Sequence, residues 1–206
     1  MSLVTVEWWV QRAGAVALVV ALAAVFIGLA RGLPRQQRTV PGWWAGLLRA
    51  PLFYAAASVG YFGLCYLIWR PLPWPLSASG RAFSLLLGSL LYFPGLALVL
   101  WGRLALGKSY FVSTGLSAQL FTGHELVTSG PYAIIRHPMY IGLLLAAWGS
   151  LLIYATWTTA YFAVAAPAVL MRSRREEAAL AEEFGEQWQE YCRRVAAFLP
   201  RLRRKR

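Results

Sequence analysis

The stretch TSGPYAIIRHPMYIG, residues 128–142, joins a polar segment to a long apolar one. The Gly130-Pro131 pair is typical of a turn. Pro138 suits the first position of a helix, because its missing N–H would be unpaired there anyway. His137, directly before that proline, is biased towards extended backbone. We therefore expect a loop that enters a helix at Pro138, with His137 at the mouth of that helix.

The first helical turn after His137 offers a chemical opportunity. The N–H groups of Met139, Tyr140 and Ile141 have no helical partner upstream, and we expect them to face the loop and attract an anionic group. Gly142 leaves room beside that turn for a ligand or for another backbone. The same pattern also fits an ordinary loop that enters a membrane helix, so the rest of the chain has to decide.

The composition indicates an integral membrane protein. Of the 206 residues, 59% are hydrophobic and only 14% are charged, which is too apolar for a soluble domain of this size. The net charge of +12 is concentrated, because half of the Lys and Arg residues follow residue 171. We interpret this charge as membrane orientation and contact with anionic lipid, and we expect no nucleic-acid partner. Cys65 and Cys192 fit no metal-binding or redox spacing and are not expected to form a disulfide.

Charge-free runs predict five transmembrane helices. Three runs are each long enough to span a bilayer, namely 13–30, 50–69 and 82–102. A fourth run, 138–171, is too long for one span, because at ~1.5 Å per residue it would reach about 50 Å against a hydrocarbon core of ~30 Å. We therefore divide it into a helical hairpin that turns between Tyr154 and Thr159. The first run is interpreted as a retained span and not as a cleaved signal.

The distribution of positive charge orients these spans. With the C-terminus in the cytoplasm, the cytoplasmic segments hold 17 of the Lys and Arg residues and the outer segments hold 3. An odd number of spans also puts the loop 103–137 on the same face as the C-terminal tail. Beyond residue 171, one apolar stripe predicts an amphipathic helix on the cytoplasmic membrane surface that covers this loop. Its members are Leu180, Phe184, Trp188, Tyr191 and Val195.

Two polar clusters flank the predicted hairpin. His137 and Tyr140 stand at its start, and Arg172 and Glu176 at its end. Because the two ends of a hairpin return to the same place, we expect these side chains to meet. Arg172 and Glu176 are four residues apart and can share one helix face.

These clusters carry a resemblance to a known family. The pattern H-x-L-V-x-x-G-P-Y-x-x-x-R-H-P-x-Y-x-G over residues 124–142 resembles the membrane-embedded isoprenylcysteine carboxyl methyltransferases, whose wider group includes phospholipid N-methyltransferases. The pattern R-x-x-x-E-E-x-x-L-x-x-x-F-G-x-x-(aromatic)-x-x-Y over residues 172–191 is similar to the same family. The resemblance covers residues 103–200, whereas residues 1–102 match only as generic spans. Trp188 departs from the pattern, since the family usually has Tyr there.

The resemblance implies a cofactor, a domain organisation and a site. The cofactor is S-adenosylmethionine. The chain 1–206 is a single membrane methyltransferase domain, with three spans in 1–102 and the cofactor loop, the hairpin and the C-terminal helix in 103–206. Arg172, which grips a substrate anion, and Glu176 are the implied catalytic residues. The implied cofactor-binding residues are His124, Glu125, Leu126, Val127, Tyr132, His137, Pro138, Met139, Tyr140, Glu176 and Glu177. No metal site is expected.

We therefore expect an all-α, multi-pass membrane enzyme that methylates a lipidic or membrane-accessible acceptor at the cytoplasmic face. The acceptor is a prenylcysteine-like carboxylate, a phospholipid amine or a thiol. A carboxylate or thiolate is already a nucleophile, so catalysis would consist mostly of proximity, orientation and exclusion of water. An amine would need a base, for which Glu177 or His124 could serve. The Arg-rich, Lys-poor composition favours a bacterial source, and we therefore expect the cytoplasmic membrane as the location. In a eukaryote the expected location would be the endoplasmic reticulum. Nothing in the sequence indicates a protein partner.

Two other readings stay open. The ending W-x-x-Y-C at residues 188–192 is also similar to the sterol reductases, which use a nicotinamide cofactor, although their central motif is similar to R-H-x-N-Y and not to R-H-P-M-Y. The other alternative is a non-catalytic membrane protein with the same fold.

Overall fold

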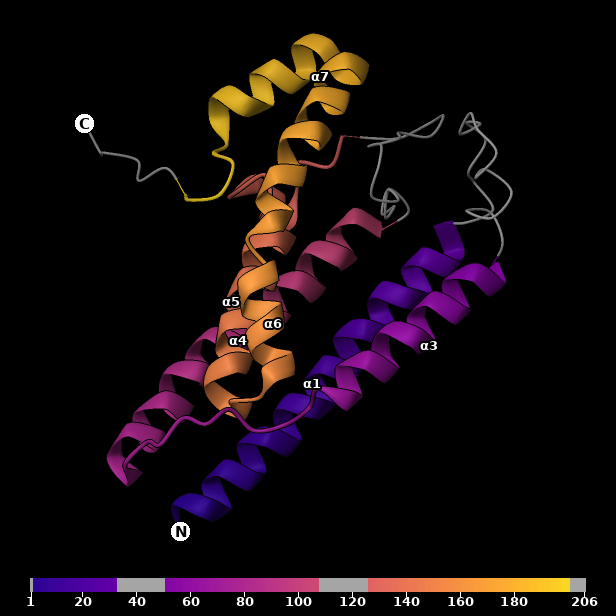
Figure 1. Ribbon diagram of the computed structural model, residues 1–206. Coiled ribbons are helices and arrows are strands. Elements are labelled where there is room, and N and C mark those ends of the chain that lie inside the picture. Colours follow the sequence, from indigo (N-terminus) through magenta and orange to yellow (C-terminus); the bar gives the residue numbers. More distant parts are fainter. Residues whose placement is uncertain (1, 33–50, 108–125, 201–206) are drawn as a thin grey trace, which may run out of the picture.

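The computed structural model describes residues 2–32, 51–107 and 126–200 (Figure 1). In this part of the chain the regular elements are all helices, as the sequence predicts. The long helices are α1 (Leu3–Gly32), α3 (Pro51–Leu67), α4 (Ala78–Leu106), α5 (Pro138–Tyr154), α6 (Trp157–Ala165) and α7 (Ala168–Arg194), and a short 3-10 helix, η3 (Gly130–Ala133), precedes α5. Two isolated backbone bridges, Pro71 with Thr156 and Ile135 with Ala196, join segments outside the helices.

Among the described residues, two helices are long and apolar enough to cross a membrane. They are Leu3–Ile27 and Ala78–Leu106, and two shorter apolar helices, Ala56–Leu67 and Pro138–Tyr154, accompany them. Length and composition thus support a membrane protein without fixing the number of spans.

α1 and α4 extend beyond the charge-free runs 13–30 and 82–102, whereas α3 lies within the run 50–69. α4 begins at Ala78, where the Ser77 side chain accepts a hydrogen bond from Gly80 N at 3.2 Å and caps the helix. Arg81 stays inside α4 because it pairs with Glu7 of α1 and donates to the Leu152 carbonyl at 2.9 Å. A charge-free window therefore underestimates helix length wherever a charged residue has a partner.

Small residues hold α4 and α5 together. A Cβ atom added at Gly142 would lie 2.6 Å from the Gly95 carbonyl oxygen, and one added at Gly149 would lie 2.5 Å from Tyr92 N. Such close approach of two backbones is the way membrane helices associate. The space beside Gly142 is thus occupied by another backbone, and the ligand that the sequence also allowed there is excluded.

Tyrosines tie α1 to this pair. Tyr92 is almost completely buried, and its hydroxyl donates to the Gly14 carbonyl at 3.0 Å. Tyr154 donates to the Gln11 carbonyl at 2.8 Å. Each hydroxyl therefore finds a backbone acceptor inside an apolar core that includes Ala21, Leu96, Ala146 and Ile153.

The predicted turn after α5 is confirmed. α5 ends at Tyr154, Ala155 takes a left-handed conformation with φ 46°, and α6 begins at Trp157. Thr156 caps α6 through a reciprocal pair of hydrogen bonds with Thr159.

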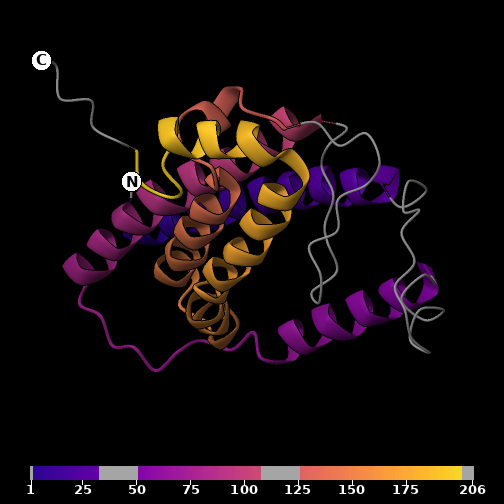
Figure 2. The same cartoon turned by 90° about the horizontal axis from the view of Figure 1, so that it is seen from above.

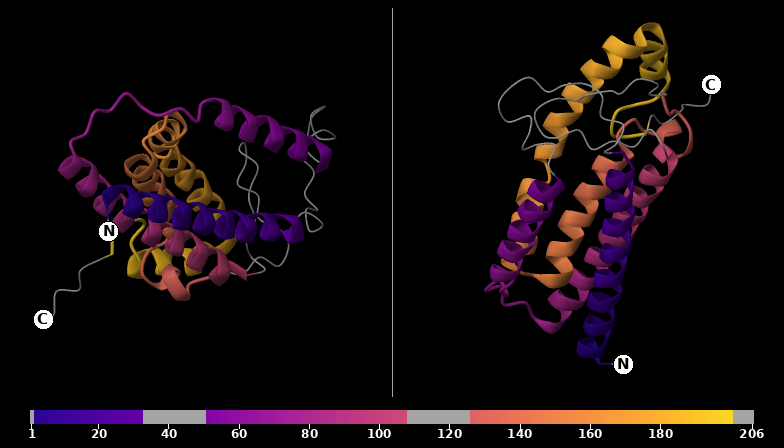
Figure 3. Two further views of the ribbon diagram at one scale, coloured as in Figure 1. Left: turned by 90° about the horizontal axis from the view of Figure 1, so that it is seen from below. Right: turned by 90° about the vertical axis from the view of Figure 1, so that its right-hand side faces the viewer.

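After a short break at Pro167, α7 continues in the direction of α6 and then folds over at Gly185, whose φ of 49° and ψ of −117° suit glycine (Figures 1 and 3). Viewed from above in Figure 2, the second part of α7 lies over the end of the bundle where α5 begins. We call residues 168–184 the first arm of α7 and residues 186–194 its second arm.

Candidate functional site at the start of α5

The turn before α5 is rigidly built. Gly130 has φ 62°, and η3 follows at once with Pro131 and Tyr132 buried. The Tyr132 carbonyl accepts a hydrogen bond of 2.7 Å from the Tyr191 hydroxyl on the second arm of α7. Burial raises the pKa of Tyr191 to about 12, so its hydroxyl stays protonated and able to donate at neutral pH.

The start of α5 corrects one expectation. Pro138 is the first residue of the helix, as predicted, and His137 precedes it with φ −121°. The Ile141 N–H, however, does not face the loop, because it donates to the His137 carbonyl at 3.2 Å. The carbonyl of an N-cap residue already accepts the first intrahelical bond, so an anion at this helix end has fewer free N–H groups available than the sequence suggested.

Glu177 of the first arm joins the turn through one carboxylate oxygen. Arg136 donates to Glu177 Oε1 from Nε at 3.0 Å and from Nη2 at 2.8 Å, and His137 Nε2 lies 2.9 Å from the same oxygen. Burial raises the pKa of Glu177, but the hydrogen bonds and charges of His137 and Arg136 outweigh it and leave that pKa below its usual value. The carboxylate is therefore ionised at neutral pH.

Glu176 makes a second, adjacent set of contacts. The Tyr140 hydroxyl donates to Glu176 Oε1 at 2.5 Å, and Arg172 Nε donates to the same oxygen at 3.0 Å. About a third of the Arg172 side chain is exposed. The two ends of the predicted hairpin thus meet, as the sequence led us to expect, and both carboxylates of the Glu pair face the start of α5.

The His137 ring lies between two aromatic rings. It stacks on Tyr140, with centroids 5.5 Å apart and planes 5° apart, and on Phe198, with centroids 5.2 Å apart. Only 7% of the His137 side chain is exposed. The ring therefore has a fixed position set by α5, by Glu177 and by the segment that follows α7.

That last segment returns to the turn as a short extended stretch. Arg136 N donates to the Ala196 carbonyl at 2.8 Å and His137 N to the Ala197 carbonyl at 3.0 Å. On the second arm, Trp188 and Tyr191 are buried, while Glu186 and Glu190 are exposed, as are Glu182 and Glu183 near the end of the first arm. The apolar stripe predicted for this helix thus faces the protein, and the arm covers the loop motif.

Sequence reasoning missed Arg136 and Phe198. Arg136 stands inside the quoted motif and contacts both arms of α7 and the segment that follows it, but the sequence analysis assigned it no role. The signal was available, because an arginine directly before His-Pro at the edge of an apolar run must find anionic or carbonyl partners once it is buried. Phe198 continues the spacing of the stripe, three residues after Val195, but it lies beyond the end of α7, so its contact with His137 did not follow from that spacing.

The remaining predicted residues are less directly joined. Leu126 and Val127 are half-buried and lie just before η3. Met139 packs against α4, where a Cβ atom added at Gly102 would lie 2.6 Å from Met139 Cγ. His124 and Glu125 fall outside the described residues.

The groups gathered here fit S-adenosylmethionine by their chemistry. The carboxylates of Glu176 and Glu177 can accept hydrogen bonds from ribose hydroxyls and from an ammonium group. Arg172 can donate to a carboxylate, and the partly exposed rings of Tyr140 and Phe198 are of the kind that stacks on an adenine ring. The donor set therefore suits a zwitterionic nucleoside cofactor at the start of α5.

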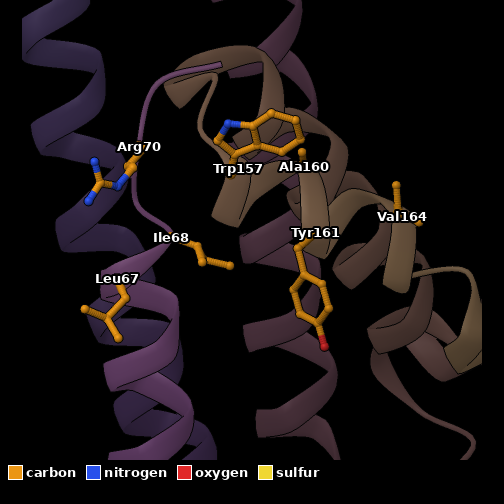
Figure 4. Close-up of a pocket in the computed structure, with 7 residues that line it drawn as sticks. All are labelled: Leu67, Ile68, Arg70, Trp157, Ala160, Tyr161 and Val164. Carbon is orange, nitrogen blue, oxygen red and sulfur yellow. The ribbon is translucent and has the colours of Figure 1, made fainter. Parts of the chain in front are cut away.

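A separate pocket lies at the other end of the bundle, between α3 and α6 (Figure 4). It has a volume of about 530 Å³ and is lined by Leu67, Ile68, Arg70, Trp157, Ala160, Tyr161 and Val164. None of the predicted site residues lines it. This apolar hollow is therefore distinct from the cluster around Glu176 and Glu177.

Comparison with known proteins matches residues 83–187, about half of the chain, to the phospholipid methyltransferase family. A methanethiol S-methyltransferase of Bradyrhizobium diazoefficiens is 35% identical over 78% of this chain, which spans 64% of that relative's length. A protein-S-isoprenylcysteine O-methyltransferase of Schizosaccharomyces pombe is 33% identical, but over 37% of this chain and 34% of its own. A Delta(14)-sterol reductase of Mus musculus is 38% identical over 36% of this chain and 18% of its own.

Proposed function

The chain belongs to the phospholipid methyltransferase family, and from this premise we propose that it transfers a methyl group from S-adenosylmethionine to a small thiol within the membrane. The observation that carries the proposal is the meeting of two distant motifs. Tyr140 and His137 at the start of α5 contact Glu176 and Glu177 of α7 at 2.5 and 2.9 Å, respectively. A family motif split over two helices becomes one site only in this arrangement.

The residues divide into roles by their chemistry. When bound, S-adenosylmethionine supplies an electrophilic methyl group on a sulfonium. Glu176, Glu177, His137 and Tyr140 hold and orient it, together with Tyr132, Pro138, Met139 and the segment 124–127. Arg172, partly exposed beside Glu176, lies where its charge can favour the anionic form of an acceptor.

The acceptor reaction needs no strong base. With a thiolate acceptor, S-adenosylmethionine would supply the methyl group, and the products would be a methyl thioether and S-adenosylhomocysteine. The thiol would first lose its proton to water, and the neighbouring Arg172 guanidinium would favour this loss. The protein contributes proximity, orientation and exclusion of water.

A thiol is preferred to the other acceptors because of the extent of similarity. The methanethiol S-methyltransferase matches over 78% of this chain, whereas the isoprenylcysteine O-methyltransferase matches over 37%. The prenylcysteine-like carboxylate and the phospholipid amine remain the alternatives to be tested. The site lies on the cytoplasmic face of a five-span domain, in the orientation that the positive charges favour.

The test uses the full chain, purified in lipid nanodiscs, with S-adenosylmethionine carrying a deuterated methyl group. Methanethiol, N-acetyl-S-farnesylcysteine and phosphatidylethanolamine are offered separately, and products are identified by mass spectrometry. We expect labelled dimethyl sulfide, formed about 10- to 100-fold more slowly by the variant Glu176→Gln. Labelled farnesylcysteine ester or labelled lipid in its place would contradict the thiol assignment.

The reductase alternative is tested with the same preparation. We expect the protein to bind S-adenosylhomocysteine and not NADPH. Binding of NADPH without binding of S-adenosylhomocysteine would overturn the methyl-transfer proposal.

A further inference from the structure

Arg136 lies between the two arms of α7. Its side chain is 12% exposed. It holds Glu177 of the first arm through two nitrogens at 3.0 and 2.8 Å, and its third nitrogen, Nη1, donates to the Val195 carbonyl, just beyond the second arm, at 2.7 Å. The guanidinium carbon also lies 5.7 Å from the centre of the Trp188 ring, a cation–π contact with the second arm. A planar fork with several donors can make all these contacts at once, and a lysine ammonium cannot.

The contact with Glu177 reaches His137 indirectly. The oxygen that accepts from Arg136 is the one that lies 2.9 Å from His137 Nε2. The carboxylate therefore fixes the orientation of the imidazole, which stacks between Tyr140 and Phe198. Arg136 thus acts on the imidazole through Glu177. If loss of Arg136 displaced Glu177, His137 would lose the contact that fixes its orientation.

The second contact holds the end of the second arm against the turn before α5. α7 changes direction at Gly185, and no heavy atom of another residue lies within 4 Å of a Cβ atom added there. Arg136 bonds to the carbonyl that follows the second arm, and its neighbouring backbone joins Ala196. A positive charge at the end of a helix is also favourable for the helix dipole.

We propose that Arg136 is the positioning residue of the methyl-transfer site, which ties the two arms of α7 together and presents Glu177 to His137. The inference rests on the proposed function and adds a residue to it. Arg136 acts through Glu177 and through the second arm and does not touch the reacting atoms.

The pH dependence of ligand binding distinguishes this role from simple packing. Glu177 is faced by Arg136 and His137 from the segment before α5 and by Tyr191 from the second arm. Arg136 lowers the pKa of Glu177, so without it this pKa rises and the carboxylate is protonated at higher pH. Ligand binding that depends on the carboxylate must then fail at higher pH as well.

The experiment measures binding of S-adenosylhomocysteine to the full chain in nanodiscs as a function of pH. In Arg136→Gln we expect affinity to fall about 10- to 100-fold at neutral pH, because bonds to a charged group are lost. We expect the pH at which binding is lost in acid to rise by about one unit or more, the usual effect of removing a close opposite charge.

Two control variants separate the causes. Arg194→Gln removes an exposed arginine of α7, which pairs with Glu190 at 3.6 Å. It should leave unchanged both the affinity and the pH at which binding is lost in acid. Tyr191→Phe removes the bond to the Tyr132 carbonyl, so it loosens the second arm while Glu177 keeps its hydrogen bonds with Arg136 and His137. It should weaken binding without changing the pH at which binding is lost in acid.

Arg136→Lys gives a second measurement if Arg136→Gln does not fold. It retains the charge beside Glu177 but not the link to Val195. We therefore expect reduced affinity, with binding lost in acid at the same pH as in the wild type. The inference would be overturned by wild-type affinity in Arg136→Lys. It would also be overturned if Arg136→Gln lost binding in acid at the same pH as the wild type.

Absence of S-adenosylhomocysteine binding by the wild-type chain would count against the proposed function instead. The inference is then judged by thermal unfolding. Arg136→Gln should still raise the pH at which stability falls in acid, and an unchanged profile would refute it.

Discussion

At the residue scale, one glutamate oxygen joins the two motifs of the site. Glu176 accepts from Tyr140 at 2.5 Å and from Arg172 at 3.0 Å, so the carboxylate is held from α5 and from its own helix. The spacing of Arg172 and Glu176 made their pairing predictable. The contact with Tyr140 was expected only because a hairpin was predicted between them.

The variant Glu176→Gln tests this junction. Removing the charge while keeping the shape should lower both the affinity for S-adenosylhomocysteine and the rate of methyl transfer by about 10- to 100-fold, because two bonds to a charged group are weakened. Combined with Tyr140→Phe, the losses should be non-additive by about 0.5–3 kcal/mol, since the two side chains share a contact. Binding calorimetry and a product assay measure these effects.

The control is Glu183→Gln, which makes the same change at an exposed position of the same helix. Equal losses in both variants would show that charge on α7, and not the Tyr140 contact, is responsible.

Glu177 should make stability depend on pH. Its pKa in the folded protein lies below the usual 4.5, because His137 and Arg136 favour the charged form. A lowered pKa contributes stability that is complete above the unfolded-state pKa and is lost as the pH falls through the folded-state value. We therefore expect Glu177→Gln to lower the melting temperature at neutral pH and to differ less from wild type as the solution becomes acidic.

Thermal unfolding in nanodiscs between neutral and acidic pH measures this difference. Glu190→Gln, at an exposed position of the second arm, is the control and should follow wild type throughout. A Glu177→Gln deficit that stays constant with pH would contradict the electrostatic account.

At the element scale, close contact between α4 and α5 fixes the position of the site. The backbone of Gly142 approaches the Gly95 carbonyl so closely that a Cβ atom would lie 2.6 Å from the oxygen. Since Gly142 lies about one turn beyond Pro138 and two residues beyond Tyr140, any shift of α5 against α4 displaces the site residues.

Gly142→Ala should therefore destabilise the protein by about 1–3 kcal/mol, the usual cost of overpacking. The matched control is Gly60→Ala in α3, where nothing lies within 4 Å of an added Cβ atom. This second change should be neutral or stabilising by up to about 1 kcal/mol, because alanine is more stable than glycine in the middle of a helix. Chemical or thermal unfolding of both variants decides, and equal effects would contradict the packing account.

At the scale of the whole molecule, the bundle has two distinct ends. The start of α5 and the bend of α7 lie at one end, while the start of α1, the segment 68–77 and the turn at Ala155 lie at the other (Figures 1 and 3). The exposed rings of Trp8, Trp9, Trp69, Trp74 and Trp157 belong to this second end. Such rings are typical of a membrane–water interface.

This arrangement predicts opposite accessibility of the two ends in a cell. In a background that lacks Cys65 and Cys192, Ser79→Cys should react with a membrane-impermeant maleimide from outside, and Arg174→Cys only after the cells are opened. Both positions are exposed. Labelling of Arg174→Cys in intact cells would show that the orientation derived from positive charge is wrong.

The sequence by itself determined the helical class, the helix start at Pro138, the turn between Tyr154 and Thr159, and the paired motifs that identify the family. These features follow from local rules: apolar runs form helices, proline and capping threonine place their ends, and a long run must turn. Local rules left open whether Gly142 faces a ligand or another backbone, and they did not predict the occupied Ile141 N–H or the place of Arg136 between the arms of α7. Only the tertiary structure decided these, because each depends on which distant backbone or charge comes within a few ångströms, and no spacing along the chain encodes that distance.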